Sequence, residues 1–158
     1  KNANTNPADR LVAGLNRAGG QVKHGGVGGW VRFMFQSNKT PQGSLKLYYH
    51  HSGSSNSGAP VTKGVIQTNR QAVYLPDADI VQNGHTHTNY WLAIPRKRLS
   101  NKGEVYTDLC HYVRTPGYKR PGAWEDLGGM EPKAVGCVFF RLSWQDRPVI
   151  HVTPEVEG

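Results

Sequence analysis

The sequence predicts a mixed α/β (α+β) domain, and three observations carry this prediction. Short apolar runs at residues 45–49 and 77–81 are typical of buried strands, and the segment between them has the apolar spacing of a helix. A strand, a helix and a strand in this order form the unit that pairs two strands in parallel. After residue 91 the pattern becomes β-type, with strands predicted at residues 92–95, 105–109, 135–144 and 147–152.

The length favours one domain, and the amino end favours a short helix ahead of the first strand. A chain of 158 residues can bury a usable core, so a single domain is expected over residues 9–158, preceded by a linker or disordered segment at residues 1–8. Within residues 9–18, Leu11, Val12 and Leu15 form an apolar stripe, and Asp9 can serve at the amino end. Two glycines then end the helix.

The elements that follow are separated by clear turn signals. Residues 30–36 alternate as a strand, and residues 38–43 are expected to turn into the next one. The glycine-rich residues 25–29 lack the Lys-Ser/Thr pair and the helix of a phosphate-binding P-loop, so they are interpreted as a flexible turn. Thr62 is expected to cap the helix between the two buried strands, which runs to about Tyr74.

The charge of the chain indicates an anionic partner. A net charge of +8 and a pI near 9.7 suit nucleic acid, a nucleotide or a phosphorylated substrate. One segment gathers cations next to aromatic residues: Arg96, Lys97, Arg98 and Lys102 follow Tyr90 and Trp91. Two interpretations stay open, namely a single-stranded nucleic-acid track and a solvated turn whose aromatic neighbours belong to the core.

The cysteines and the apolar runs exclude several classes of protein. Cys110 and Cys137 are too few and too far apart for a disulfide framework, so both are interpreted as packed thiols in a reducing compartment. Cys110 and His111 are neighbours on a strand and are expected to face opposite sides, which disfavours a Cys/His nucleophile. Because there is neither a signal peptide nor an apolar run of about 20 residues, we expect a soluble, cytoplasmic protein without a membrane partner.

The strongest functional signal is a pair of histidines after a buried strand. The apolar run at residues 79–81 breaks at Gly84 and is followed by His85 and His87. In an extended segment alternate side chains share a side, so both imidazoles can point at one locus. The alternative is two exposed loop histidines.

A second strand delivers histidines in the same way. Residues 45–49 run directly into His50 and His51, followed by a loop rich in serine and glycine. The carboxyl ends of strands are where ligands gather in open α/β sheets. Neutral imidazole suits zinc, iron, copper and nickel, and carboxylates nearby would also suit manganese.

These elements together resemble the calcineurin-like metallophosphoesterases, in the form common in bacteriophage genomes. The resemblance covers roughly residues 22–142. It rests on the strand-His-His-Ser-Gly loop at residues 49–58, the Ala-Pro-Val-Thr-Lys-Gly run at 59–64, the strand at 77–81 with Gly-His-Thr-His at 84–87, and Thr-Pro-Gly-Tyr-Lys at 115–119.

The resemblance implies a β-sandwich flanked by helices and a metal-dependent phosphoester hydrolase, either a phosphodiesterase or a phosphatase. It implies two divalent transition metals, chosen from manganese, iron and zinc. His50, with His51 as the alternative, and His85 would bind one metal, and His87 the other. Asp79 would be structural or would accept a hydrogen bond from an imidazole. The residues expected to contact substrate are Lys63, Asn83 and Tyr118.

The chain also departs from the family pattern. Enzymes of the family carry Asp-x-His, Gly-Asp and Gly-Asn-His-Asp/Glu motifs upstream of the strand-borne histidine, whereas residues 1–44 hold one aspartate, Asp9, and one histidine, His24. The chain therefore resembles only the C-terminal half of the domain. It is expected to be a fragment of the catalytic domain. Whether the chain is an enzyme by itself therefore stays open. The alternative is a non-catalytic basic phage protein that binds nucleic acid or has a structural role on a degenerate phosphoesterase fold.

Overall fold

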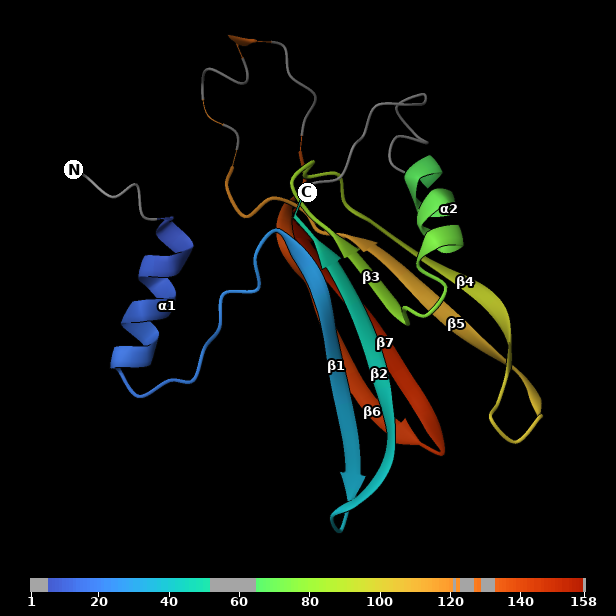
Figure 1. Cartoon of the computed structure of the whole chain (residues 1–158). Coiled ribbons are helices and arrows are strands. Elements are labelled where there is room, and N and C mark those ends of the chain that lie inside the picture. The colour runs from blue at the N-terminus through green and yellow to red at the C-terminus, as the bar shows by residue number, and fades with distance from the viewer. Residues whose placement is uncertain (1–5, 52–64, 121, 123–126, 129–132, 158) are drawn as a thin grey trace.

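A computed structural model describes residues 6–51, 65–120, 122, 127–128 and 133–157, and these ranges form a mixed α+β fold (Figure 1). The predicted class is thereby confirmed. The described elements, in chain order, are α1 (Pro7–Arg17), β1 (Gly28–Ser37), β2 (Thr40–His50), α2 (Val65–Tyr74), β3 (Ile80–Asn83), β4 (Tyr90–Leu99), β5 (Val105–Arg114), β6 (Val135–Gln145) and β7 (Arg147–Glu157). Within the described ranges, no helix is long and apolar enough to span a bilayer.

A five-stranded mixed sheet forms the centre of the structure. Its order is β1-β2-β3-β5-β4, with β2, β3 and β5 parallel and the two edge strands antiparallel to their neighbours. The predicted strand-helix-strand unit is confirmed, because α2 connects β2 to the parallel strand β3. In the register, His50 lies beside Asn83, which lies beside Arg114, so the three parallel strands end together.

Each face of the sheet carries its own apolar cluster. Ile80 and Val81 are both fully buried, and because neighbours on a strand point to opposite faces, β3 contributes to both clusters. Val81 packs with Tyr112 and Leu75 on the face that α2 covers (Figure 1). Ile80 packs with Leu45 and Leu47 on the opposite face, which the two-stranded sheet of β6 and β7 covers through Phe140, Leu142 and Ile150.

The start of α1 and the turn between β1 and β2 differ from their predicted positions. Helix α1 begins at Pro7, with the side chain of Asn6 accepting from the Ala8 amide, so Asn6 caps it and Asp9 lies in its first turn. The turn expected at residues 38–43 is limited to Asn38 and Lys39. Both have positive φ angles of 48° and 67°, as a tight two-residue hairpin turn requires, and β2 then begins at once.

The glycine-rich segment at residues 25–29 is closely packed, which corrects its interpretation as a flexible turn. A Cβ at Gly25 would lie 2.1 Å from the hydroxyl of Tyr49, and one at Gly28 would lie 2.6 Å from Cδ2 of His50. Gly28 already belongs to β1. These glycines allow the chain to approach the end of β2 at a distance that no larger residue permits.

Asp79 is a structural residue, which is one of the two roles expected for it. Its Oδ2 accepts from the amide of Lys46 at 2.8 Å, and its Oδ1 pairs with Arg96 at 3.1 Å. Arg96 also forms a bidentate pair with Asp108 and donates to the carbonyls of Ala78 and Pro76. This network fixes the amino end of β3, at the opposite end of the strand from His85.

Cys110 and His111 face opposite sides of β5, as predicted. The thiol of Cys110 donates to the carbonyl of Ala78 at 3.1 Å, and Nδ1 of His111 accepts from Nε1 of Trp91 at 3.1 Å. Burial raises the pKa of the Cys110 thiol, which disfavours the nucleophilic thiolate. Both cysteines are free, and Cys110 is buried as predicted, whereas Cys137 is exposed, which corrects its interpretation as a packed thiol.

Acidification is expected to destabilise the fold through His111. Burial and then the positive charge of Arg96 lower the pKa of His111 below its usual value. An unfolded histidine takes up its proton near pH 6.5, whereas folded His111 does so at lower pH. Between these values the unfolded state binds more protons, so the free energy of unfolding falls as pH falls, by up to about 1.4 kcal/mol per pH unit.

Urea unfolding at pH 7.5 and pH 5.5 measures this effect. The variant His111→Gln, whose amide oxygen can still accept from Trp91, should lose less stability between the two values than the unmodified chain. His151→Gln is the matched control, because His151 is exposed on β7. Equal pH dependence in the His111 variant and the unmodified chain would contradict the assignment.

Candidate functional site

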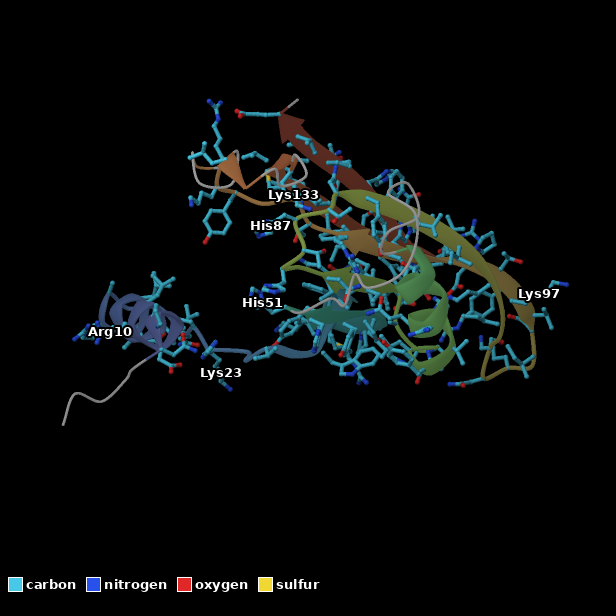
Figure 2. All side chains as sticks on the ribbon, turned by 90° about the horizontal axis from the view of Figure 1, so that it is seen from above. Arg10, Lys23, His51, His87, Lys97 and Lys133 are labelled. Atoms are coloured by element: carbon cyan, nitrogen blue, oxygen red, sulfur yellow. The ribbon has the colours of Figure 1, made fainter. Side chains whose placement is uncertain are left out.

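The carboxyl ends of the parallel strands form one edge of the sheet, and the histidines lie along it. Strand β2 ends at His50, β3 at Asn83 and β5 at Arg114. Figure 2 shows His51 and His87 at this edge, on the side that faces α1. This is the position at which open parallel sheets bind their ligands.

Backbone hydrogen bonds hold the strand ends in fixed register beyond the strands themselves. The amide of Gly84 donates to the carbonyl of His50 at 3.0 Å, and the amide of Thr115 donates to the carbonyl of Asn83 at 3.0 Å. The carbonyl of Asn83 also accepts from the Thr115 hydroxyl at 3.4 Å. The loops that leave β2, β3 and β5 therefore start side by side.

The structure brings His51 and His85 together. Their ring centres are 5.4 Å apart and the rings are inclined by 57°. Two imidazoles that bind one metal through nitrogens at about 2.0–2.1 Å, at a tetrahedral angle, have ring centres roughly 5.2 Å apart. The observed separation therefore fits a pair of imidazoles that shares one metal.

His50 has a different environment from His51, because neighbouring residues at the end of a strand point to opposite faces. The ring of His50 stacks on that of Tyr48, with centres 6.3 Å apart and planes within 6° of parallel. The ring contact with His85 therefore belongs to His51, the alternative ligand, rather than to His50, the preferred one.

His85 and His87 do not form the extended segment on which their convergence was predicted, and both are exposed loop residues, as in the alternative interpretation. Their φ angles are 74° and 55°, in the left-handed region, and residues 84–89 contain no strand. His85 turns to His51, whereas His87 packs on Gly117, where an added Cβ would lie 3.1 Å from its Nδ1. Left-handed residues other than glycine cost roughly 1–3 kcal/mol each and cluster at functional sites.

Asn83 is a structural residue, which corrects its expected role in substrate contact. Its side chain is 1% exposed and exchanges two hydrogen bonds of 2.9 Å with the amide of Gln71 on α2. Both polar groups of the Asn83 side chain are therefore used to hold the crossover helix on the sheet. Tyr118 is 95% exposed, and Lys63 lies outside the described residues.

The basic segment of β4 provides fewer available cations than its sequence indicated. Arg96 pairs with Asp79 and Asp108, and Arg98 lies 3.5–3.9 Å from carboxylates of the same cluster. Lys97 is exposed at the far end of the molecule from His51 and His87 (Figure 2). Two of the four cations expected to line a nucleic-acid track are thus engaged in stabilising the fold.

Sequence reasoning missed two features of this edge. Arg114, fully buried at the end of β5, has its guanidinium 5.4 Å from the centre of the Tyr90 ring. Nδ1 of His24 lies 2.7 Å from Oδ1 of Asp9, 15 residues away. Neither contact follows a motif spacing, so no local signal in the sequence could have identified it.

The histidine pair is not a complete metal centre within the described part of the chain. No group of three or more His, Cys, Asp or Glu residues there is arranged to hold a metal ion. His51 and His85 could supply two nitrogens, and further ligands would have to come from elsewhere or from a rearrangement of His87.

A scan of protein-family models and searches of curated proteins and of solved structures found no match to this chain.

Proposed function

We propose that this chain is the histidine-bearing part of a metal-dependent phosphoester hydrolase with a metallophosphoesterase-like β-sandwich. The observation that carries the proposal is the contact between His51 and His85 at the carboxyl edge of three parallel strands. The spacing of these rings fits a shared transition metal. The positive charge of the chain is consistent with an anionic substrate.

The three histidines of this edge would have different metal-binding roles. His51 and His85 would hold one metal ion, and His87 would turn from Gly117 to a second. Such a pair of metals lowers the pKa of a water molecule and neutralises charge on the phosphoryl group. The backbone ties between β2, β3 and β5 would keep the ligands in place.

The remaining ligands belong, in this proposal, to polypeptide outside the described residues. A two-metal site for phosphoester hydrolysis needs carboxylate or amide oxygens beside its imidazoles. The acidic cluster around Asp79 lies at the other end of β3 and is paired with Arg96. The chain alone is therefore expected to hold one metal and to hydrolyse phosphodiesters poorly.

Metal analysis of the purified chain tests this proposal. The chain is loaded with zinc, manganese or cobalt, dialysed against metal-free buffer and analysed by inductively coupled plasma mass spectrometry. We expect about one metal per chain, and for cobalt a visible absorption spectrum typical of nitrogen ligands. A chain that retains no metal would overturn the proposal and favour the non-catalytic, nucleic-acid-binding alternative.

A further inference from the structure

The segment between α1 and β1, residues 18–27, is fastened along the end of β2 and is here called the strap. The hydroxyl of Tyr49 donates to the carbonyl of Gly25 at 2.5 Å. The amide of His51 donates to the carbonyl of Val27 at 2.7 Å. Because Tyr49 and His51 belong to β2 and its end, these bonds hold the strap beside the histidine edge.

The strap carries an imidazole whose orientation is fixed by a carboxylate. Nδ1 of His24 lies 2.7 Å from Oδ1 of Asp9 on α1. An ionised carboxylate only accepts hydrogen bonds, so Nδ1 carries the hydrogen and Nε2 is the atom available to a ligand. Nε2 accepts a hydrogen bond while the ring is neutral and donates one when the ring is protonated. A similar arrangement orients histidines at many functional sites.

A pocket of about 490 Å³ lies between the strap and the histidine edge. His24 and Gly26 line it from the strap, and His50, His51, Gly84 and Thr115 line it from the ends of β2, β3 and β5. Its volume is that of a small-molecule site.

We propose that this pocket binds a small phosphoester, with its phosphoryl group between His24 and His51. The ligand class rests on the proposed function, whereas the pocket and the Asp9–His24 pair stand on their own geometry. Lys23 is exposed on the strap, next to His24 in the sequence (Figure 2), and the chain as a whole is positively charged, which favours an anionic ligand. Asp9 is the positioning residue, and His24 contacts the ligand.

Histidine nitrogen NMR tests the proposal without requiring catalysis. Long-range ¹H–¹⁵N spectra of the metal-free chain, kept in EDTA, report the tautomer of each ring. We expect His24 to carry its hydrogen on Nδ1. Phenyl phosphate and AMP should shift the Nε2 signal of His24 and the signals of His51 and Gly84, and leave His151 unchanged.

Two variants separate positioning from folding. Asp9→Ala should release His24 to the mixed tautomers of a free histidine and weaken phenyl phosphate binding several-fold, and Asp9→Glu should restore part of both. Binding unaffected by Asp9→Ala, or a His24 signal that does not respond while His51 does, would overturn the role of the pair.

The ligand class has its own control. A response to sulfate equal to that to phenyl phosphate would mean a general anion site, and no response at any of these residues would overturn the pocket. Because these spectra are recorded without metal, their outcome is independent of the metal analysis. A chain that binds metal but not phenyl phosphate would support the proposed function and contradict this inference. A chain that binds phenyl phosphate but not metal would contradict the proposed function and support the pocket as a binding site.

Discussion

His85→Ala is expected to lower the affinity of the chain for its first metal ion by roughly 100-fold or more. Loss of residues that only orient a ligand costs about 10–100-fold in metal affinity, and His85 is proposed to be a ligand itself. The fold should change little, because residue 85 lies in a loop after β3. Isothermal titration with zinc measures the affinity, and circular dichroism checks the fold.

A matched variant excludes a backbone effect. His85 has a φ of 74°, which asparagine adopts more readily than alanine does. His85→Asn should therefore lose the metal while keeping the conformation of the loop. Unchanged metal stoichiometry in both variants would count against the whole assignment.

The same titration decides between the two neighbouring histidines. His51→Ala should have an effect as large as that of His85→Ala, because the two rings are in contact. His50→Ala should reduce the affinity far less, because the His50 ring stacks on Tyr48. A larger loss of affinity in His50→Ala than in His51→Ala would mean that His50 is the metal ligand.

Arg96→Ala is expected to destabilise the fold by roughly 3 kcal/mol, near the lower end for breaking a buried ion pair. The guanidinium is 16% exposed, and its loss removes the hydrogen-bonded cation from Asp79 and Asp108, which are largely buried. These two carboxylates then keep only the longer ion pairs to Arg98. The carbonyls of Ala78 and Pro76 lose a donor as well. Urea unfolding near pH 7 measures the change in the free energy of unfolding.

Arg98→Ala is the matched control, because Arg98 lies two residues along the same strand. Its nitrogens are 3.5–3.9 Å from the carboxylates of Asp77, Asp79 and Asp108, beyond good hydrogen-bond length. A loss below about 1 kcal/mol is expected for this weaker set of ion pairs. Equal losses in the two variants would mean that net charge, rather than the hydrogen-bonded geometry of Arg96, stabilises this end of the sheet.

The sequence was sufficient to predict the central parallel unit. The runs at residues 45–49 and 77–81 are short and rich in apolar residues, as strands covered on both faces must be, and a helix between them leaves a parallel pairing as the ordinary outcome. The positions of the four later strands followed from alternation, and three of them begin at the predicted residue, whereas β4, β5 and β7 extend beyond their predicted carboxyl ends. The edge at which the histidines gather was therefore predictable before their side chains were placed.

The finer geometry of the site was not predictable. It depends on which of two neighbouring residues faces each side of the sheet, and on unusual backbone angles. Whether His50 or His51 meets His85 is decided by which residue of β2 points to which face. The left-handed angles at His85 and His87 removed the alternation on which their convergence was based. The pairing of Asp9 with His24 joins a helix to a distant strap, and no pattern in the sequence encodes it.

The short length and central position of β3 have a consequence for how the chain folds. Strands β1–β2, β4–β5 and β6–β7 are three local antiparallel hairpins, each closed by a brief turn. The four residues of β3 are the link that joins the first two hairpins into one sheet, through partners about 30 residues away on either side. Closing such long loops is slow compared with hairpin formation. The ligand edge is therefore expected to form after the hairpins, when β3 pairs with β2 and β5 and His51 and His85 become neighbours.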